Sequence, residues 1–162
     1  TPSEEVSSLR TSTAEIETFL VDNAASKDVA VGGYDAYEVS FTLKPQFEGK
    51  TKVTLCNACG EKFSLEFDTE NMTVLADRSE SGKMTRIKSF VLMPAAPLGL
   101  CTSSDGYDVD VFVDKCSVEV FVDGGRIAMT NLVFPSESFD NIVFESTGES
   151  EISNMFIHKI GK

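Results

Sequence analysis

A two-residue alternation of apolar and polar side chains runs through most of the chain and constrains its fold more than any other feature. In DAYEVSFTL (residues 35–43), the apolar side chains alternate with Glu38, Ser40 and Thr42. EKFSLEF (residues 61–67) repeats the pattern. Successive side chains of a strand point to opposite faces, so this period indicates strands with one buried face. Tyr37 belongs to the apolar series and is expected to be buried.

About eleven such segments can be recognised, separated by short stretches rich in Gly, Asn, Asp and Ser. Besides the two above and KVTLC, they are AEIETFLV, MTVLAD, MTRIKSFVL, YDVDVFV, CSVEVFV, RIAMTNLVF, NIVFES and EISNMFIHK. Short strands at this spacing predict an all-β fold, an antiparallel two-sheet sandwich or a barrel. The 12 Phe residues would fill the space between two sheets. Only PSEEVSSLR near the start reads as a short helix or a linker.

Length and charge limit the partners of this domain. A chain of 162 residues with 41% hydrophobic residues fits one domain with a sizeable core. The net charge of −12 argues against nucleic acid and anionic membranes, which attract clustered Lys and Arg. No apolar run of about 18 residues and no signal peptide pattern is visible. A neutral ligand such as a sugar is compatible with this charge.

His158 is the chain's single histidine and the only base that a Ser-His-Asp triad could use. It lies four residues from the end on the last predicted strand, and GxSxG is absent. We expect a surface or edge-strand histidine. SGKMT resembles a phosphate-binding loop only at Gly82-Lys83, with Asp77 at the earlier glycine position, so phosphate binding is not expected.

The four cysteines include one close pair, Cys56 and Cys59, in the sequence CNAC. A closed zinc site needs about four ligands, and Cys101, Cys116 and His158 are isolated from the pair. CNACGEK separates two strand patterns, which predicts a hairpin loop with free thiols. A disulfide bridge across the turn is the alternative.

Acidic residues recur at Asp105, Asp108, Asp110 and Asp114 without the glycine and terminal glutamate of a calcium loop. Acids on an exposed sheet face explain the series, and a looser calcium site using loop carbonyls is the alternative. Asn71-Met72-Thr73 matches a glycosylation sequon. Paired carboxylates could serve glycoside hydrolysis, but with 26 acidic residues such pairs arise by number alone.

The segment YDVDVFVDKCSVEVFVDGGRIAMTNLVFP (residues 107–135) resembles the C-terminal module of glycoside hydrolase family 32, the invertases, levanases, inulinases and other β-fructosidases. That module reads like L-x-x-x-V-D-x-S-S-V-E-V-F-V-N-x-G, then a strand, then F-P. Val113-Asp114, residues 117–122, Gly125 and Phe134-Pro135 fit it, while Cys116 stands where the family often has Ser. LADRSESGK (residues 75–83) resembles the module's D-R-x-x-S-G turn, and EEVSSLR its interdomain linker.

The resemblance implies a lectin-like sandwich of two antiparallel sheets, with residues 1–13 as a linker remnant and residues 14–162 as the sandwich. It also implies that the chemistry belongs to an N-terminal five-bladed propeller, with a nucleophile in N-D-P-N-G, a stabilising Asp in R-D-P and an acid/base Glu in E-C. None of these motifs occurs in this sequence. We therefore expect no catalytic residue, metal or cofactor here.

The expected role is a non-catalytic domain that stabilises the propeller, which would hydrolyse β-fructosyl linkages of fructans or sucrose with retention. A domain that binds fructan oligosaccharides itself is the first alternative, and an enzyme using carboxylates of the sandwich is the second. Candidate contacts to the propeller or to sugar are Arg10, Tyr34, Tyr107, Glu119 and Phe121. Secretion, cell-surface or periplasmic location is favoured over the cytoplasm.

Within CSVEVFV, alternation places Val118, Val120 and Val122 on one face, expected to be the core. Glu119 and Phe121 fall on the opposite face, and Asp123-Gly124 supplies a tight turn. Glu119 is thus expected to support the sheet or to meet the propeller rather than to catalyse a reaction.

Overall fold

The computed structural model describes residues 10–31, 36–47, 49–68, 73–80, 95–97, 106–114, 117–122, 127–133, 135 and 137–160. Within these ranges all regular structure is strand, and no helix long and apolar enough to cross a bilayer is found. The strands are β1 (Arg10–Ile16), β2 (Phe19–Asp22), β3 (Lys27–Ala30), β4 (Tyr37–Phe47), β5 (Lys50–Cys56), β6 (Lys62–Asp68), β7 (Thr73–Glu80), β8 (Ala95–Pro97), β9 (Tyr107–Val113), β10 (Ser117–Val122), β11 (Ile127–Leu132), β12 (Asn141–Ser146) and β13 (Glu149–Ile160).

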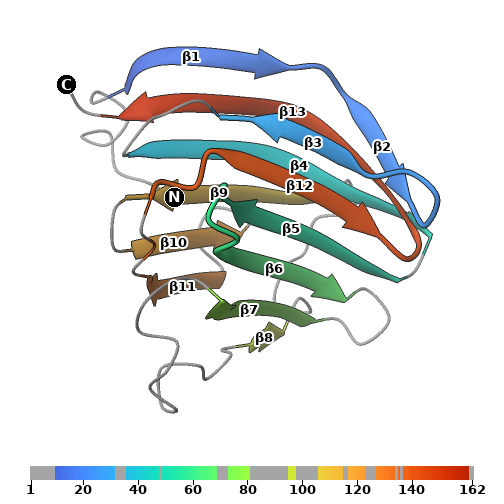
Figure 1. The fold of residues 1–162 in the computed structure, drawn as a ribbon. Coiled ribbons are helices and arrows are strands. Elements are labelled where there is room, and N and C mark those ends of the chain that lie inside the picture. The colour runs from blue at the N-terminus through green and yellow to red at the C-terminus, as the bar shows by residue number, and fades with distance from the viewer. Residues whose placement is uncertain are drawn as a thin grey trace.

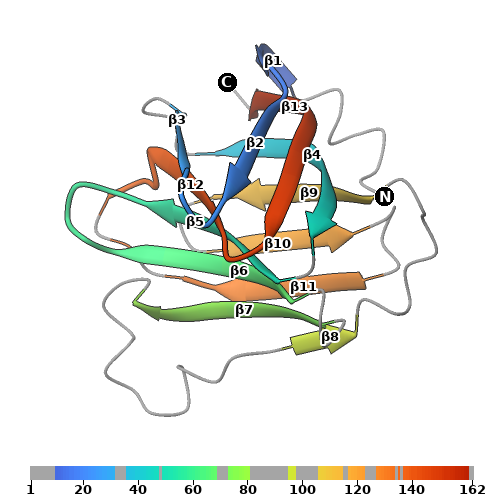
Figure 2. The same cartoon turned by 90° about the vertical axis from the view of Figure 1, so that its right-hand side faces the viewer.

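The strands form two antiparallel sheets packed as layers (Figures 1 and 2). Sheet A has the order β1-β13-β4-β9-β10-β11, and β2 also pairs with β13. Sheet B has the order β3-β12-β5-β6-β7-β8. The predicted two-sheet antiparallel sandwich is confirmed.

The core lies between the sheets because the apolar half of each alternating strand points inward. The burial pattern of β9 and β10 alternates at every residue. Phe144 of sheet B contacts Phe41 of sheet A edge to face, with ring centroids 5.4 Å apart. The Phe19 ring contacts Phe144 in the same way, at 5.2 Å. These aromatic contacts join the two layers.

Tyr37 is fully buried, as predicted from its place in the apolar series. Its hydroxyl donates a hydrogen bond of 2.7 Å to the carbonyl oxygen of Phe139, in the segment that leads into β12. Burial, with smaller contributions from Asp140 and Cys56, raises the pKa of Tyr37 far above its ordinary value. The phenol therefore satisfies a carbonyl while its ring fills the core.

The long strand β13 contains an irregularity at Asn154, whose φ is +51°. The register to β4 shifts between Ser153 and Phe156. Ile152, Met155 and Ile157 all point into the core. Two residues, instead of the usual one, therefore lie between Ile152 and Met155. An extra residue in a left-handed conformation, which Asn tolerates, restores the inward alternation.

Several strand boundaries differ from the sequence-based expectation. The predicted segment AEIETFLV is divided between β1 and β2, and β3 and β8 were not predicted. β7 continues to Glu80 through residues expected to form a turn, because they pair with β6 across a bulge between Lys62 and Ser64. Residues 2–9, the predicted strand over residues 84–92 and the turn at Asp123-Gly124 lie outside the described residues.

Candidate functional site

The two faces of β10 have the orientation predicted from the sequence. Val118, Val120 and Val122 have no exposed surface, whereas Glu119 and Phe121 are half-buried on the other face of the strand. Glu119 and Phe121 therefore point away from the core of the sandwich.

Strand pairing extends this outward face across sheet A. One row runs through paired residues on six strands, namely Thr13, His158, Glu38, Phe112, Glu119 and Thr130. The neighbouring row contains Glu15, Phe156, Ser40, Asp110, Phe121 and Ala128. These two rows are called here the outer face of sheet A.

Aromatic rings occupy much of the outer face of sheet A. Phe112 and Phe121 meet edge to face, with ring centroids 5.8 Å apart and an interplanar angle of 81°. Phe156 stacks on His158 at 6.0 Å, with the two planes 10° apart. All three phenylalanines are half-buried. A sheet face in water usually carries polar side chains, so three rings here require an explanation.

Glu38 lies at the centre of this face and has no exposed surface, although it points away from the core. Its Oε2 atom is inaccessible to solvent. Its neighbours in the row are His158 and Phe112. The middle of the outer face therefore combines a carboxylate with aromatic rings and excludes water.

The expectation of a surface or edge-strand His158 was wrong. Its side chain is 8% exposed, and β13 pairs with β1 on one side and β4 on the other. The hydroxyl of Thr13 lies 2.9 Å from His158 Nδ1. A position near the chain end does not place a strand at a sheet edge, because the C-terminal strand here is inserted between two others.

The other predicted contact residues are not gathered with Glu119 and Phe121. Tyr107 begins β9 on the inward side, opposite Leu43, and is 9% exposed. Arg10 pairs through its backbone with Ile160 at the start of β1. Tyr34 lies outside the described residues. Sequence reasoning did not identify Phe112 as the neighbour of Glu119, nor Glu38 and Phe156 as residues of the same face, since their placement depends on strand order.

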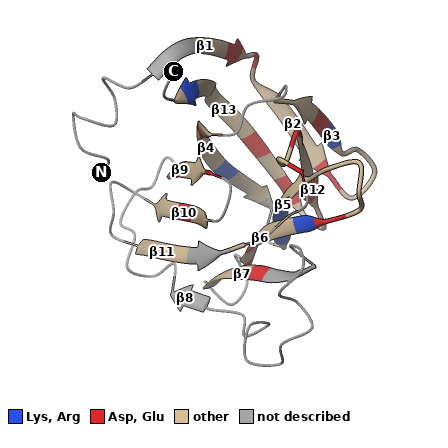
Figure 3. Cartoon of the chain, turned by 60° about the vertical axis from the view of Figure 1, so that its left-hand side comes forward, with Lys and Arg blue, Asp and Glu red and all other residues tan. Residues whose placement is uncertain are grey.

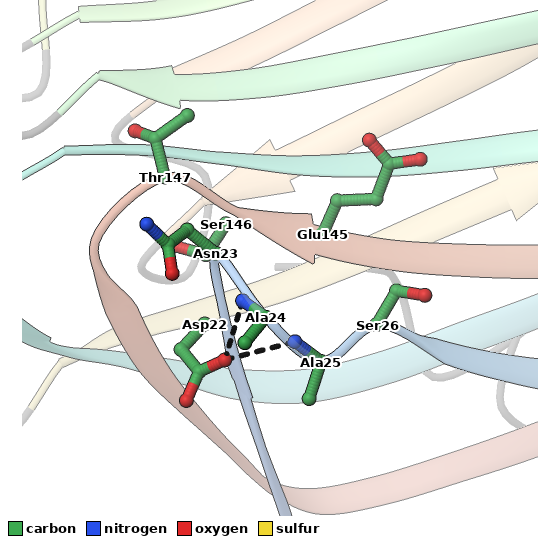
Figure 4. A pocket seen from close by; sticks show the side chains of 8 residues that line it. All are labelled: Asp22, Asn23, Ala24, Ala25, Ser26, Glu145, Ser146 and Thr147. Carbon is green, nitrogen blue, oxygen red and sulfur yellow. Dashed lines mark hydrogen bonds between the residues drawn. The ribbon is translucent and has the colours of Figure 1, made fainter.

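A polar pocket of about 310 Å³ lies at another place, between the β2–β3 connection and the end of β12 (Figure 4). It is lined by Asp22, Asn23, Ala24, Ala25, Ser26, Glu145, Ser146 and Thr147. Asp22 Oδ1 accepts hydrogen bonds from the backbone N–H groups of Ala24 (2.8 Å) and Ala25 (2.9 Å), which shapes the turn. The pocket offers hydroxyl, amide and carboxylate groups but no aromatic ring.

A smaller pocket of about 130 Å³ shares Glu145, Ser146 and Thr147 with the first and adds Lys50, Lys52 and Glu66. The buried hydroxyl of Thr51 bonds those of Ser146, at 3.0 Å, and Ser150, at 2.7 Å. These hydroxyls are used within the sandwich, so they support the end of the fold rather than a ligand.

The predicted free thiols of the CNAC hairpin are confirmed for Cys56 and Cys59. The side-chain oxygen of Asn57 accepts hydrogen bonds from the N–H groups of Cys59 and Glu61, at 3.0 and 3.2 Å, which closes the turn. Burial raises the pKa of Cys56, and desolvation followed by Glu137 and Glu61 raises the pKa of Cys59. Reactive cysteines have lowered pKa values, so the raised pKa values of these two thiols do not favour the thiolate form.

The described members of the acidic series serve the sheet. Asp108 accepts a hydrogen bond of 2.8 Å from Thr42, and Asp114 accepts bonds of 2.8 and 3.0 Å from the N–H and hydroxyl of Ser117. Asp110 lies on the outer face of sheet A, and Asp105, Cys101 and Cys116 lie outside the described residues. Among the residues with described positions, no three His, Cys, Asp or Glu side chains are grouped to hold a metal ion.

Comparison with known proteins gives a consistent family assignment. Residues 5–159 match the family model described as "Glycosyl hydrolases family 32 C terminal". A levanase of Bacillus subtilis (strain 168) is 25% identical over 166 residues, covering 100% of this chain and 24% of the levanase. A fructan beta-fructosidase of Streptococcus mutans is 31% identical over 105 residues, covering 63% of this chain and 7% of that protein. The chain thus spans a quarter or less of these two relatives.

Solved structures share the fold. The exo-inulinase from Aspergillus awamori superposes with a TM-score of 0.73 and 23% identity, over 97% of this chain and 31% of the inulinase. The beta-fructofuranosidase from Schwanniomyces occidentalis gives a TM-score of 0.75 and 18% identity, over 94% of this chain and 34% of that one. At these identities the likeness concerns the fold alone.

Proposed function

This chain belongs to the family of C-terminal domains of glycosyl hydrolases family 32, and we propose that it is a non-catalytic domain that stabilises the catalytic domain of a β-fructosidase. By family resemblance that partner is a five-bladed propeller in the same polypeptide, which hydrolyses β-fructosyl linkages of fructans or sucrose. Residues 1–13 would form the connection to it, with β1 beginning at Arg10 inside that segment.

The observation that carries this proposal is the composition of the outer face of sheet A. Domain interfaces are enriched in aromatic residues at their centres and have polar rims. Phe112 lies beside the buried Glu38, and Phe156 and Phe121 lie in the neighbouring row. The exposed residues Thr13, Glu15 and Thr130 lie toward the margins. Leu20, which is 54% exposed, points to the same side from β2.

The outward side of sheet B is different and serves as an internal comparison. Glu145, Lys52 and Glu66 are neighbours across three strands and alternate in charge, and Thr54 and Ser64 are paired in the adjoining row. Its apolar outward residues, Val143 and Leu75, are aliphatic and half-buried. Thr54 and Ser64 are themselves buried, but the described residues on this side include no aromatic ring, so we place the docking surface on sheet A.

Removing the sandwich from the full polypeptide tests the proposal. The catalytic domain alone is expected to aggregate or to lose activity quickly on warming, because its docking surface would be exposed. Thermal inactivation of the two proteins, followed with sucrose and levan as substrates, measures the difference. A catalytic domain that is stable and fully active by itself would contradict the scaffold role.

Fructan binding by the sandwich is the second candidate, supported by the polar pocket of about 310 Å³ between the β2–β3 connection and β12. Pockets of about 300 Å³ can take small ligands, and the hydroxyl and carboxylate groups there could bind sugar hydroxyls. Calorimetry of the 162-residue chain with fructan oligosaccharides tests this candidate. Binding that Glu145→Ala abolishes supports it, and no heat at millimolar oligosaccharide excludes it.

A further inference from the structure

We infer that Glu119, together with the rings of Phe112 and Phe121, forms a seat for an arginine side chain presented by the catalytic domain. This inference rests on the proposed docking of that domain on the outer face of sheet A, and it assigns the chemistry of the partner surface. Phe112 on β9 and Glu119 on β10 belong to one row of the outer face, and Phe121 on β10 belongs to the neighbouring row.

The three side chains are held together by strand pairing. Glu119 lies directly opposite Phe112 on β9, and Phe121 follows two residues later on the same face of β10. The two rings contact edge to face at 5.8 Å. Glu119 is half-buried between the strands that flank it. Its position is fixed by the ladder rather than by a mobile loop.

Glu119 makes no hydrogen bond or ion pair with the rest of the chain that the structure describes. The three strands around it, β9, β10 and β11, contain no Lys or Arg, whereas Lys115 and Arg126 in the adjoining turns lie outside the described residues. The described parts of these strands carry no blue in Figure 3. Lys44 on the outward side of β4 is six residues from Glu38, roughly 20 Å along the strand. A domain that docks here would desolvate the carboxylate further, and a cation on that domain would offset the cost.

Arginine fits a site made of a carboxylate and two aromatic rings better than lysine does. A planar guanidinium can lie against an aromatic ring and donate two parallel hydrogen bonds to a carboxylate. Cation–π attraction to Phe112 or Phe121 adds to the charge pair. The compact ammonium group of lysine makes neither planar contact.

A second copy of this chain does not fit the seat. A symmetric dimer through the outer face of sheet A would place this patch, with its acidic residues Glu119, Asp110 and Glu15, against a second copy of itself. Both chains would also carry a net charge of −12. Like charges brought together at an interface oppose association, which leaves a basic surface of the catalytic domain as the occupant.

The test uses the full polypeptide with Glu119→Gln, which removes the charge and keeps the shape. Glu66→Gln is the matched control, a half-buried carboxylate on the outward side of sheet B. Scanning calorimetry of both variants is paired with the same substitutions in the 162-residue chain alone. We expect Glu119→Gln to lower the unfolding midpoint of the full polypeptide by several degrees. We expect Glu66→Gln to leave it unchanged, and the chain alone to be indifferent to both.

Charge reversal identifies the partner residue. Glu119→Arg should lower the midpoint further, and one Arg→Glu substitution on the catalytic domain should restore it. A structural role of Glu119 inside the sandwich would not allow this rescue. Equal losses in the full polypeptide and in the chain alone would overturn the inference.

The same series separates this inference from the function on which it rests. If Phe121→Ser lowers the unfolding midpoint of the full polypeptide only, while Glu119→Gln has no effect, the outer face of sheet A docks without a cation. The arginine seat is then wrong, but the proposed docking stands. If neither substitution distinguishes the full polypeptide from the chain alone, the docking surface itself is wrong. Stabilisation of the wild-type chain alone by added fructan oligosaccharide, lost in Glu119→Gln, would mean a sugar site at Glu119, which also overturns the inference.

Discussion

Tyr37 shows how one side chain can satisfy both packing and hydrogen bonding in this sandwich. Tyr37→Phe keeps the ring but leaves the carbonyl of Phe139 without the hydrogen bond that it now accepts at 2.7 Å. Because that carbonyl is buried with the Phe139 side chain, we expect a loss of about 1–3 kcal/mol in the free energy of unfolding. Urea denaturation of the two proteins measures the loss, and equal midpoints would contradict the contact.

The same residue predicts a loss of stability at alkaline pH. Burial raises the pKa of Tyr37 in the folded chain, so the folded state holds the phenol proton more tightly than the unfolded state does. The contribution of Tyr37 to the free energy of unfolding is therefore complete below the ordinary tyrosine pKa of about 10 and declines as the pH rises above that value. Unfolding midpoints between pH 8 and pH 11 should fall more steeply for the wild type than for Tyr37→Phe. If the midpoints of the two proteins fall in parallel with pH, Tyr37 is not the source of the alkaline loss of stability.

The two hairpin thiols should react slowly with alkylating reagents. The pKa of each thiol is raised, and only the thiolate is nucleophilic. Cys59 is exposed and Cys56 is half-buried, so we expect iodoacetamide to modify Cys59 first. Glu137→Gln should speed the labelling of Cys59 at pH 8, because it removes one carboxylate that raises its pKa. Peptide mass spectrometry can follow each cysteine, and faster labelling of Cys56 would disagree with the structure.

Residue orientation was predictable where alternation is unbroken. The facing of Glu119 and Phe121 follows from the valines between them, because a strand has a period of two residues. The environment of Glu119 was not predictable, since the order of β4, β9 and β10 is what places Phe112 beside it and Glu38 beyond Phe112. The prediction that His158 lies at the surface or on an edge strand failed for the same reason, because the sequence does not tell which strands flank the last one.

At the scale of elements, the start of β9 depends on a glycine. Gly106 has a φ of +110°, and a Cβ there would lie 2.7 Å from the carbonyl oxygen of Leu43 on β4. Gly106→Ala combines an unfavourable backbone conformation with a clash against a fixed strand. We expect it to cost roughly 2–5 kcal/mol in the free energy of unfolding.

Gly60 provides the matched control for this prediction. Its φ is +80°, but a Cβ there meets nothing within 4 Å. Gly60→Ala should therefore cost only the conformational penalty of about 1–2 kcal/mol. Thermal unfolding of both variants compares the two costs, and a larger loss for Gly60→Ala would show that the approach of β9 to β4 is not tight.

Element boundaries were least predictable where the alternation is interrupted. The bulge at Asn154 shifts the register of β13, and the chain turns between β1 and β2 inside one predicted strand. β3 was missed because, of its four residues, only Val29 is buried, which leaves no repeating pattern. Backbone pairing with β12 holds it in place instead.

At the scale of the whole molecule, the two sheets present unlike outward surfaces. The sandwich architecture could be expected from strand spacing, and the family resemblance was carried by the segment around β10. Neither indicated which sheet faces another domain. That distinction depends on bringing Phe112, Phe121 and Phe156 together from three strands, which only the topology reveals.

Hydroxyl-radical footprinting tests the central claim, that the outer face of sheet A docks on the catalytic domain. Phe112, Phe121 and Phe156 should be oxidised in the 162-residue chain alone and protected in the full polypeptide. Val143 and Leu75, on the outward side of sheet B, should be oxidised equally in both proteins. Unchanged oxidation of the three phenylalanines, with protection of Val143 and Leu75, would place the interface on the opposite sheet and contradict the account.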